Sequence, residues 1–215
     1  MTKLLKKSES RKVKMIEADK KREQIIEGAI KRFSHFGIGK TTMNDIAEDL
    51  SVSKPSLYYY FPDKRSLIVG VIEKVFTDYF DRLKKKYNPD ATLETVLFQT
   101  IDIRNTFFMK YFMLRISEGL PDIFNDDQMK KKLTALKDSE KEFYAEIFER
   151  AQRNGEIKHE NMAHVAELYL ESLMGLTNMC IMELGKDLLP DKKAVNKMTQ
   201  KQKDLSSIFT KGLKC

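Results

Sequence analysis

The sequence predicts an all-α protein of about nine helices. Apolar residues recur at spacings of three and four along nearly the whole chain, and this is the period of a helix with one buried face. No stretch alternates between apolar and polar residues with the period of two that half-buried strands show. Only nine glycines and five prolines interrupt the 215 residues, and several of them separate the periodic segments. We therefore expect helices joined by short connections.

Composition excludes several classes of protein. Hydrophobic residues make up 41% of the chain, which is enough for a substantial core, so disorder throughout is not expected. Two cysteines, Cys180 and Cys215, are too few for a disulfide scaffold. No apolar stretch approaches the roughly 20 residues that cross a bilayer, and the N-terminus lacks the apolar run of a signal peptide. We expect a cytoplasmic protein without a membrane partner.

Positive charge is concentrated in the first part of the chain. The formal net charge is +7, but residues 1–87 carry 20 Lys and Arg against 12 Asp and Glu, whereas residues 88–215 carry 19 against 20. The net charges of the two parts are therefore +8 and −1. A positive segment on a nearly neutral body suggests a module that binds a polyanion, although a solvated basic face would give the same count.

The N-terminal segment, residues 1–18, carries six basic and two acidic side chains with weak apolar periodicity. We expect a flexible basic arm there, which could add phosphate contacts or only aid solubility. A first amphipathic helix follows, because Ile26, Ile30 and Phe33 share one stripe. Gly37 is placed to end it.

Two short helices come next. Thr42 can cap the first, in which Met43, Ile46, Ala47 and Leu50 share one buried face. The second is the stretch PSLYYYF, which begins with a proline. Proline suits the first turn of a helix because its missing N–H is not needed there.

A long helix is predicted from about residue 64 to residue 86, ending before Asn88 and Pro89. Beyond it the periodicity predicts five further helices, at about residues 92–104, 106–118, 127–153, 161–184 and 192–211.

The two short helices, at about residues 42–61, satisfy the geometric requirement for a helix-turn-helix. In such a unit one helix enters the major groove of DNA, about 12 Å wide, while its partner braces it across the backbone. Leu57 and Phe61, four residues apart, would point inward. Core packing could explain the tyrosines, but three consecutive residues cannot all point the same way on a helix. Exposed positions would include Lys54, Ser56, Tyr58 and Tyr59.

A longer motif surrounds these helices, namely IIEGAIKRFSHFGIGKTTMNDIAEDLSVSKPSLYYYFPDKRSLI. It resembles the DNA-binding domain of the TetR family of bacterial transcriptional regulators over about residues 20–80. The resemblance implies a DNA-binding domain at residues 19–80 and a helical domain for ligand binding and dimerisation at residues 81–215.

The same resemblance implies a set of DNA contacts. Thr42 and Lys64 match family residues that meet phosphates at helix starts, although Thr42 could be a plain helix cap and Lys54 a plain surface lysine. Lys54, Pro55 and Ser56 match the family positions that reach base edges. The tyrosines match an aromatic run whose third residue, here Tyr60, is often His. The implied contact residues are Thr42, Lys54, Pro55, Ser56, Tyr58, Tyr59, Tyr60 and Lys64.

Aromatic and methionine side chains are frequent between residues 90 and 184. They could line an adaptable apolar pocket, although such stripes are ordinarily core. Members of the family commonly hold a small ligand among these helices, so the resemblance implies an unknown small-molecule effector. The candidate lining residues are Phe108, Phe112, Phe148 and Met174.

The last two long helices look like the pair that forms a four-helix dimer interface in the family. Ser172, Gly175 and Thr177 are small enough to allow close approach. A homodimer also follows from DNA geometry, because two recognition helices read a palindromic operator better than one.

These observations favour a repressor that binds double-stranded DNA and is released by a small apolar or amphipathic ligand. The alternative is a helical small-molecule-binding protein or enzyme with an incidental basic N-terminus. No catalytic motif or cofactor site is recognisable. His159 and His164 are five apart, which does not place two imidazoles on one helical face, so no metal is expected. Cys180 has no basic or His neighbour in sequence and is expected to be a buried thiol.

Overall fold

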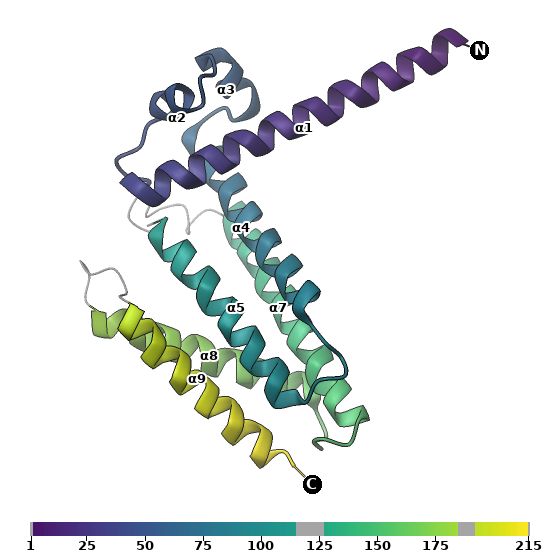
Figure 1. Cartoon of the computed structure of the whole chain (residues 1–215), viewed down its shortest axis with the longest axis vertical. Coiled ribbons are helices and arrows are strands. Elements are labelled where there is room, and N and C mark those ends of the chain that lie inside the picture. The colour runs from purple at the N-terminus through teal and green to yellow at the C-terminus, as the bar shows by residue number, and fades with distance from the viewer. Residues whose placement is uncertain (1, 115–126, 185–191, 215) are drawn as a thin grey trace. The chain divides into compact units, whose positions relative to one another are not determined.

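The computed structural model describes residues 2–114, 127–184 and 192–214, and the helix labels follow Figure 1. Within these residues there are eight helices and no strand, so the all-α prediction is confirmed for the described part of the chain. The helices are α1 (Thr2–Phe36), α2 (Met43–Asp49), α3 (Lys54–Tyr60), α4 (Lys64–Lys86), α5 (Leu93–Met113), α7 (Asp127–Arg153), α8 (Met162–Leu184) and α9 (Lys192–Gly212).

Within the described residues, helix α5 takes the place of two predicted helices, so eight helices are seen there where about nine were predicted for the whole chain. The sequence predicted two helices with a break at residue 105, but α5 runs through this position. Asn105 is 4% exposed, and its side-chain amide donates to Thr199 Oγ1 and Gln202 Oε1 of α9, both at 2.8 Å. The side-chain NH2 group therefore has partners without leaving the helix, whereas the buried Asn105 Oδ1 has no hydrogen-bond partner among the described residues. The last part of the predicted helix at 106–118, from residue 115 onward, lies outside the described residues.

Helix α1 differs from the expected flexible arm. Residues 2–18 are helical and continuous with the predicted amphipathic helix, so the basic segment projects as part of α1. No proline lies in this helix, and its lysines, arginines, glutamates and leucines are good helix formers. Weak apolar periodicity therefore did not mean absence of a helix.

The chain folds as two compact units. Among the described residues, the first unit holds α1, α2, α3 and α4 as far as Lys74. The second holds α4 from Val75, most of α5, and α7, α8 and α9. The division lies within α4, earlier on this helix than the expected boundary at residue 80.

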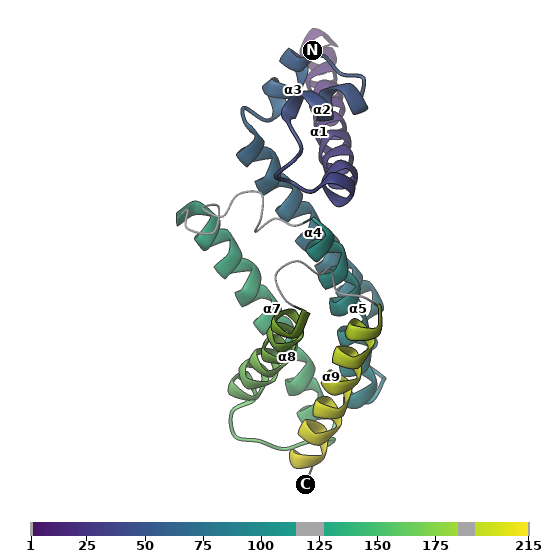
Figure 2. The same cartoon turned by 90° about the vertical axis from the view of Figure 1, so that its left-hand side faces the viewer.

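In the first unit, α2 packs on both α1 and α3 (Figures 1 and 2). The apolar stripes of the sequence form its core, although Ile30 and Leu50, which were also expected to point inward, are only half-buried. Phe33, Ile46, Leu57 and Phe61 are each at most 2% exposed. This packing fixes the two short helices, which are too short to be stable alone.

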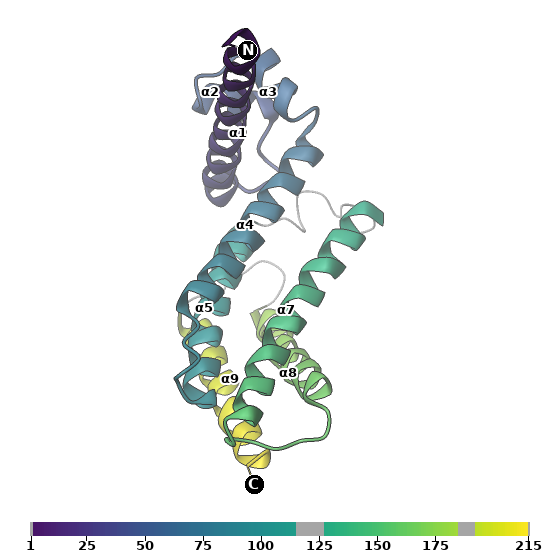
Figure 3. The same ribbon diagram turned by 90° about the vertical axis from the view of Figure 1, so that its right-hand side faces the viewer.

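In the second unit, α8 packs on α7 and on α9 (Figure 3). Tyr169 of α8 is fully buried, and its ring centroid lies 5.4–5.5 Å from those of Tyr144, Phe148 and Phe209. Its hydroxyl forms a 2.7 Å hydrogen bond with Ser206 of α9. The apolar faces of α7, α8 and α9 thus form a core around the buried Tyr169.

No helix in the described part of the chain is long and apolar enough to cross a membrane. The described residues also hold no group of three or more His, Cys, Asp or Glu that could bind a metal ion. Cys180 is a buried thiol, as predicted.

Candidate nucleic-acid interface and internal cavity

Helix α2 begins at a reciprocal cap. Thr42 Oγ1 accepts a hydrogen bond from the Asp45 N–H at 3.2 Å, and the Asp45 carboxylate accepts one from the Thr42 N–H at 2.7 Å. Hydrogen bonding of the Thr42 N–H, and of the Thr42 side chain, to the Asp45 carboxylate lowers the pKa of Asp45. Two orphan N–H groups are satisfied, and Thr42 itself stays exposed. The predicted cap is therefore confirmed.

The turn after α2 is closed by backbone bonds. The N–H of Ser51 donates to Glu48 O and that of Val52 to Ala47 O, both at 3.0 Å, which is the pattern of a Schellman motif. Ser51 adopts a φ of 52°, in the left-handed region that glycine ordinarily occupies. The chain is thereby reversed within a few residues and α3 starts at a fixed position.

Helix α3 is held on its inner face. Ser53 caps it by accepting the Ser56 N–H at 3.3 Å, and Pro55 lies in the first turn as predicted. Leu57 is fully buried, and the guanidinium of Arg22 in α1 lies 5.0 Å from the ring centre of Phe61. These contacts fix which face of α3 is turned toward the protein interior.

The outer face of α3 presents three large side chains to solvent. Tyr59 is 80% exposed and Tyr58 is 44% exposed, and Lys54 is exposed as well. Tyr60 is half-buried and packs edge-to-face on Tyr59, with ring centroids 5.1 Å apart. Of the other predicted contact residues, Pro55 is exposed and Ser56 is half-buried. No tyrosine of the run belongs to the buried core.

Lys64 begins α4, where Asp63 caps the helix by accepting the Ser66 N–H at 2.6 Å. Partial burial lowers the pKa of Lys64, and the negative charge of Asp45 acts in the opposite direction. Lys64 and Thr42 thus lie at the starts of two helices, where N–H groups and positive charge favour an anion such as a phosphate.

Arg32 of α1 neutralises the acidic side of α2. It donates to Asp49 at 2.7 Å and lies 3.7 Å from Asp45. Sequence reasoning missed this pair because the residues are 17 positions apart. A carboxylate paired with an arginine repels a nearby phosphate less than a free one does.

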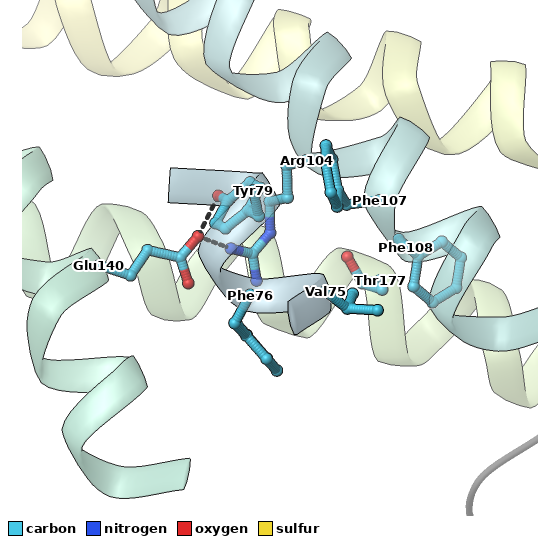
Figure 4. A pocket seen from close by; sticks show the side chains of 8 residues that line it. All are labelled: Val75, Phe76, Tyr79, Arg104, Phe107, Phe108, Glu140 and Thr177. Atoms are coloured by element: carbon cyan, nitrogen blue, oxygen red, sulfur yellow. Dashed lines mark hydrogen bonds and ion pairs between the residues drawn. The ribbon is translucent and has the colours of Figure 1, made fainter. Parts of the chain in front are cut away.

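The second unit contains a cavity of about 210 Å³ (Figure 4). It is lined by residues of α4, α5, α7 and α8, namely Val75, Phe76, Tyr79, Arg104, Phe107, Phe108, Glu140 and Thr177. Four of these are aromatic, and one end of the cavity carries the ion pair of Arg104 with Glu140.

The predicted lining residues fall in different places. Phe108 lies on the cavity wall. Phe148 is fully buried in the main core and Met174 packs against that core, so neither lines this cavity. The side chain of Phe112 lies outside the described residues. The charged wall was missed because Arg104 and Glu140 lie 36 positions apart without a motif around them.

Helix α8 exposes an apolar stripe, which we define as Leu168, Gly175, Met179 and Met182. The three large side chains are 44%, 53% and 81% exposed in chain order, and Gly175 has open space at its Cβ position. Spacings of seven, four and three residues place them on one helical face. Thr177, expected on this face, instead lines the cavity and accepts a hydrogen bond from Gln202 of α9 at 3.1 Å.

Comparison with known proteins agrees with this geometry. Residues 25–71 match the family described as bacterial regulatory proteins, tetR family. Over 99 residues the chain is 31% identical to the Staphylococcus aureus negative transcriptional regulator of the biofilm operon icaADBC, IcaR. That match covers 43% of this chain and 53% of IcaR. The chain thus spans about half the length of this curated relative.

Among solved structures, a transcriptional regulator from Cytophaga hutchinsonii is similar over 91% of this chain and 99% of its own, with a TM-score of 0.81 and 29% identity. A regulator from Saccharomonospora viridis, solved in complex with choline, is similar in fold. It has a TM-score of 0.69 and 16% identity, and the match covers 88% of this chain and 96% of that one.

Proposed function

Because the chain belongs to the TetR family of bacterial regulatory proteins, we propose that it is a DNA-binding transcriptional repressor released by a small molecule. The observation that carries the proposal is the exposed face of α3, held outward by the buried Leu57 and Phe61. IcaR, which resembles this chain over 99 residues, is a negative regulator by name, and this favours repression.

In the DNA complex, α3 enters the major groove. Lys54 and Ser56 reach base edges at its start, while Tyr58 and Tyr59 contact the backbone or the thymine methyl group. Thr42 and Lys64 bind phosphates on either side, each at a helix start. The +8 charge of residues 1–87 supplies the attraction for the phosphate backbone.

The proposed repressor is a homodimer. Its interface is formed by α8 and α9 and is centred on the exposed stripe of α8, because exposed apolar surface of this kind marks protein–protein interfaces. Ile208 of α9, which is 67% exposed, extends the same interface. Two copies of α3 then read a palindromic operator.

Release by an effector would act through the cavity of the second unit. Thr177 on the cavity wall is bonded to Gln202, whose side-chain oxygen accepts from Asn105 at 2.8 Å. A molecule in the cavity thus touches a residue tied to α9. By linkage, an effector that releases DNA must bind the DNA-free protein more tightly than the complex.

The test is binding of the full chain to random duplex DNA at increasing salt. We expect an affinity that falls steeply with salt, because each phosphate contact releases counterions. Absence of binding even at low salt would contradict the proposal and favour a small-molecule-binding protein with an incidental basic N-terminus.

A further inference from the structure

The cavity of the second unit has an apolar body and one polar end. Val75, Phe107 and Phe108 form part of the apolar wall, and Thr177 adds a hydroxyl (Figure 4). At the polar end, Arg104 and the Tyr79 hydroxyl both donate to Glu140. The side chains of the pair are only 17% and 10% exposed.

Both bonds to Glu140 end on the same carboxylate oxygen, Oε1. The other oxygen makes no bond to the side chains drawn in Figure 4. Arg104 likewise uses one terminal nitrogen for Glu140, whereas a guanidinium has five N–H donors. The polar end therefore offers an acceptor and a donor next to each other, beyond those the pair uses internally.

The pair is electrically balanced. Burial is the largest single effect on Arg104 and lowers its pKa, but the attraction of Glu140, together with smaller contributions from Tyr79 and Tyr144, raises the pKa overall. Burial raises the pKa of Tyr79, so its hydroxyl stays protonated and donates at neutral pH. A ligand with a net charge would add an uncompensated charge to a largely apolar space, which is costly.

We propose that this cavity takes an uncharged molecule about the size of one ring, whose amide-like edge donates to Glu140 and accepts from Arg104. The inference rests on the proposed function, because it names the chemical class of the effector. A volume of about 210 Å³ fits this size. An engineered apolar cavity of about 150 Å³ holds benzene, so the extra space accommodates a small polar group.

The same wall discriminates against charged relatives of this molecule. A carboxylate would pair with Arg104 only by facing Glu140, which has the same charge. A cation would be attracted by the aromatic rings and by Glu140, but it would face Arg104. An uncharged ring without a polar edge would fill the space and leave the remaining polar atoms without partners.

Four probes of similar size separate these cases: benzamide, benzoate, benzamidine and toluene. The full chain, free of DNA and labelled at its methyl groups, is titrated with each probe at pH 7. The readout is the methyl NMR signal of Val75, which lines the cavity. We expect benzamide to bind at least tenfold more tightly than each of the other three.

Two variants test the roles of the charges. Glu140→Gln keeps the shape and leaves Arg104 as an unbalanced cation, so benzoate should gain at least tenfold and become the preferred probe. If that variant does not fold, the double variant Arg104→Met with Glu140→Met removes both charges and both hydrogen-bonding groups, and benzamide should lose its advantage over toluene.

The proposal is overturned if a charged probe binds the unmodified chain most tightly, if all four bind equally, or if none shifts the Val75 signal. It is also overturned if a folded variant retains the original order of affinities. The DNA assay is independent of these titrations. If the chain binds DNA but does not prefer benzamide, only the proposed ligand class is wrong. If the chain prefers benzamide but does not bind DNA, the proposed regulatory function is wrong.

Discussion

Thr42 and Asp45 cap α2 reciprocally: the Thr42 hydroxyl accepts the Asp45 N–H at 3.2 Å, and the Asp45 carboxylate accepts the Thr42 N–H at 2.7 Å. The pair fixes the start of the helix that braces α3. The Asp45 carboxylate is engaged in a hydrogen bond of this cap, and Thr42 stays exposed, where a phosphate could approach.

Replacement of Thr42 should therefore affect folding and DNA binding together. Thr42→Ala removes the cap acceptor and should lower the free energy of unfolding by about 1 kcal/mol. Thr42→Ser retains a hydroxyl and should recover most of this loss. Urea unfolding measures stability and a duplex titration measures affinity. Equal stability of the alanine and serine variants would show that the cap contributes nothing.

Tyr59 and Leu57 lie on opposite faces of α3, so alanine substitutions should separate binding from folding. Tyr59→Ala removes an 80% exposed ring and should weaken DNA binding with little change in melting temperature. Leu57→Ala empties a fully buried site and should cost about 2–5 kcal/mol of stability. Thermal melting and DNA titration of both variants provide the check. A similar fall in melting temperature for both variants would contradict the separate roles of Tyr59 in binding and Leu57 in folding.

Lys64 should contribute one phosphate contact. Its replacement by alanine should weaken binding to all duplex sequences and reduce the slope of log affinity against log salt by about 0.9. Lys85→Ala is the matched control, because it removes an exposed charge near the other end of α4. The salt series would speak against a Lys64 contact if both variants kept the original slope.

Local chemistry made the first unit predictable from sequence. The cap at Thr42, the proline at position 55 and the inward pair Leu57 and Phe61 each depend on residues within four positions, and the structure confirms them. The motif also overlaps residues 25–71, which match the family described as bacterial regulatory proteins, tetR family.

Long-range contacts explain what the sequence did not predict. Asn105 was expected in a break because its partners in α9 lie more than 90 positions away. Phe148 was a reasonable pocket candidate by composition, but Tyr169 and other core residues enclose it. Thr177 was expected on the outer face of α8, whereas Gln202 and the cavity hold it inside. Periodicity gives a helix its apolar stripe, but it does not say which other helix meets each residue.

The exposed stripe of α8 should determine the oligomeric state. Met182→Glu places a charge on a residue that is 81% exposed in the single chain and would be buried in the proposed dimer. We expect sedimentation to show the 25.1 kDa monomer for this variant and twice that mass for the unmodified chain. Ala163→Glu, an exposed position on another side of the same helix, is the control. A dimer that tolerates Met182→Glu would place the interface elsewhere.

Tyr144 should make the second unit sensitive to alkali. Burial, followed by the nearby charge of Glu140, raises the pKa of Tyr144 to about 12. In the unfolded chain a tyrosine titrates near about pH 10. Between these values the folded protein retains a proton that the unfolded chain has lost, so stability falls as pH rises, by about 1.4 kcal/mol per pH unit for one such group.

Tyr144→Phe keeps the ring and removes the ionisable hydroxyl, so its stability should fall less steeply over this range. Denaturant unfolding at pH 8, 10, 11 and 12 compares the two proteins. The difference between their free energies of unfolding should be nearly constant from pH 8 to pH 10. Above pH 10 it should shift in favour of the variant as pH rises. Because other alkaline titrations are common to both proteins, parallel curves up to pH 12 would mean that Tyr144 does not hold its proton more tightly in the folded state.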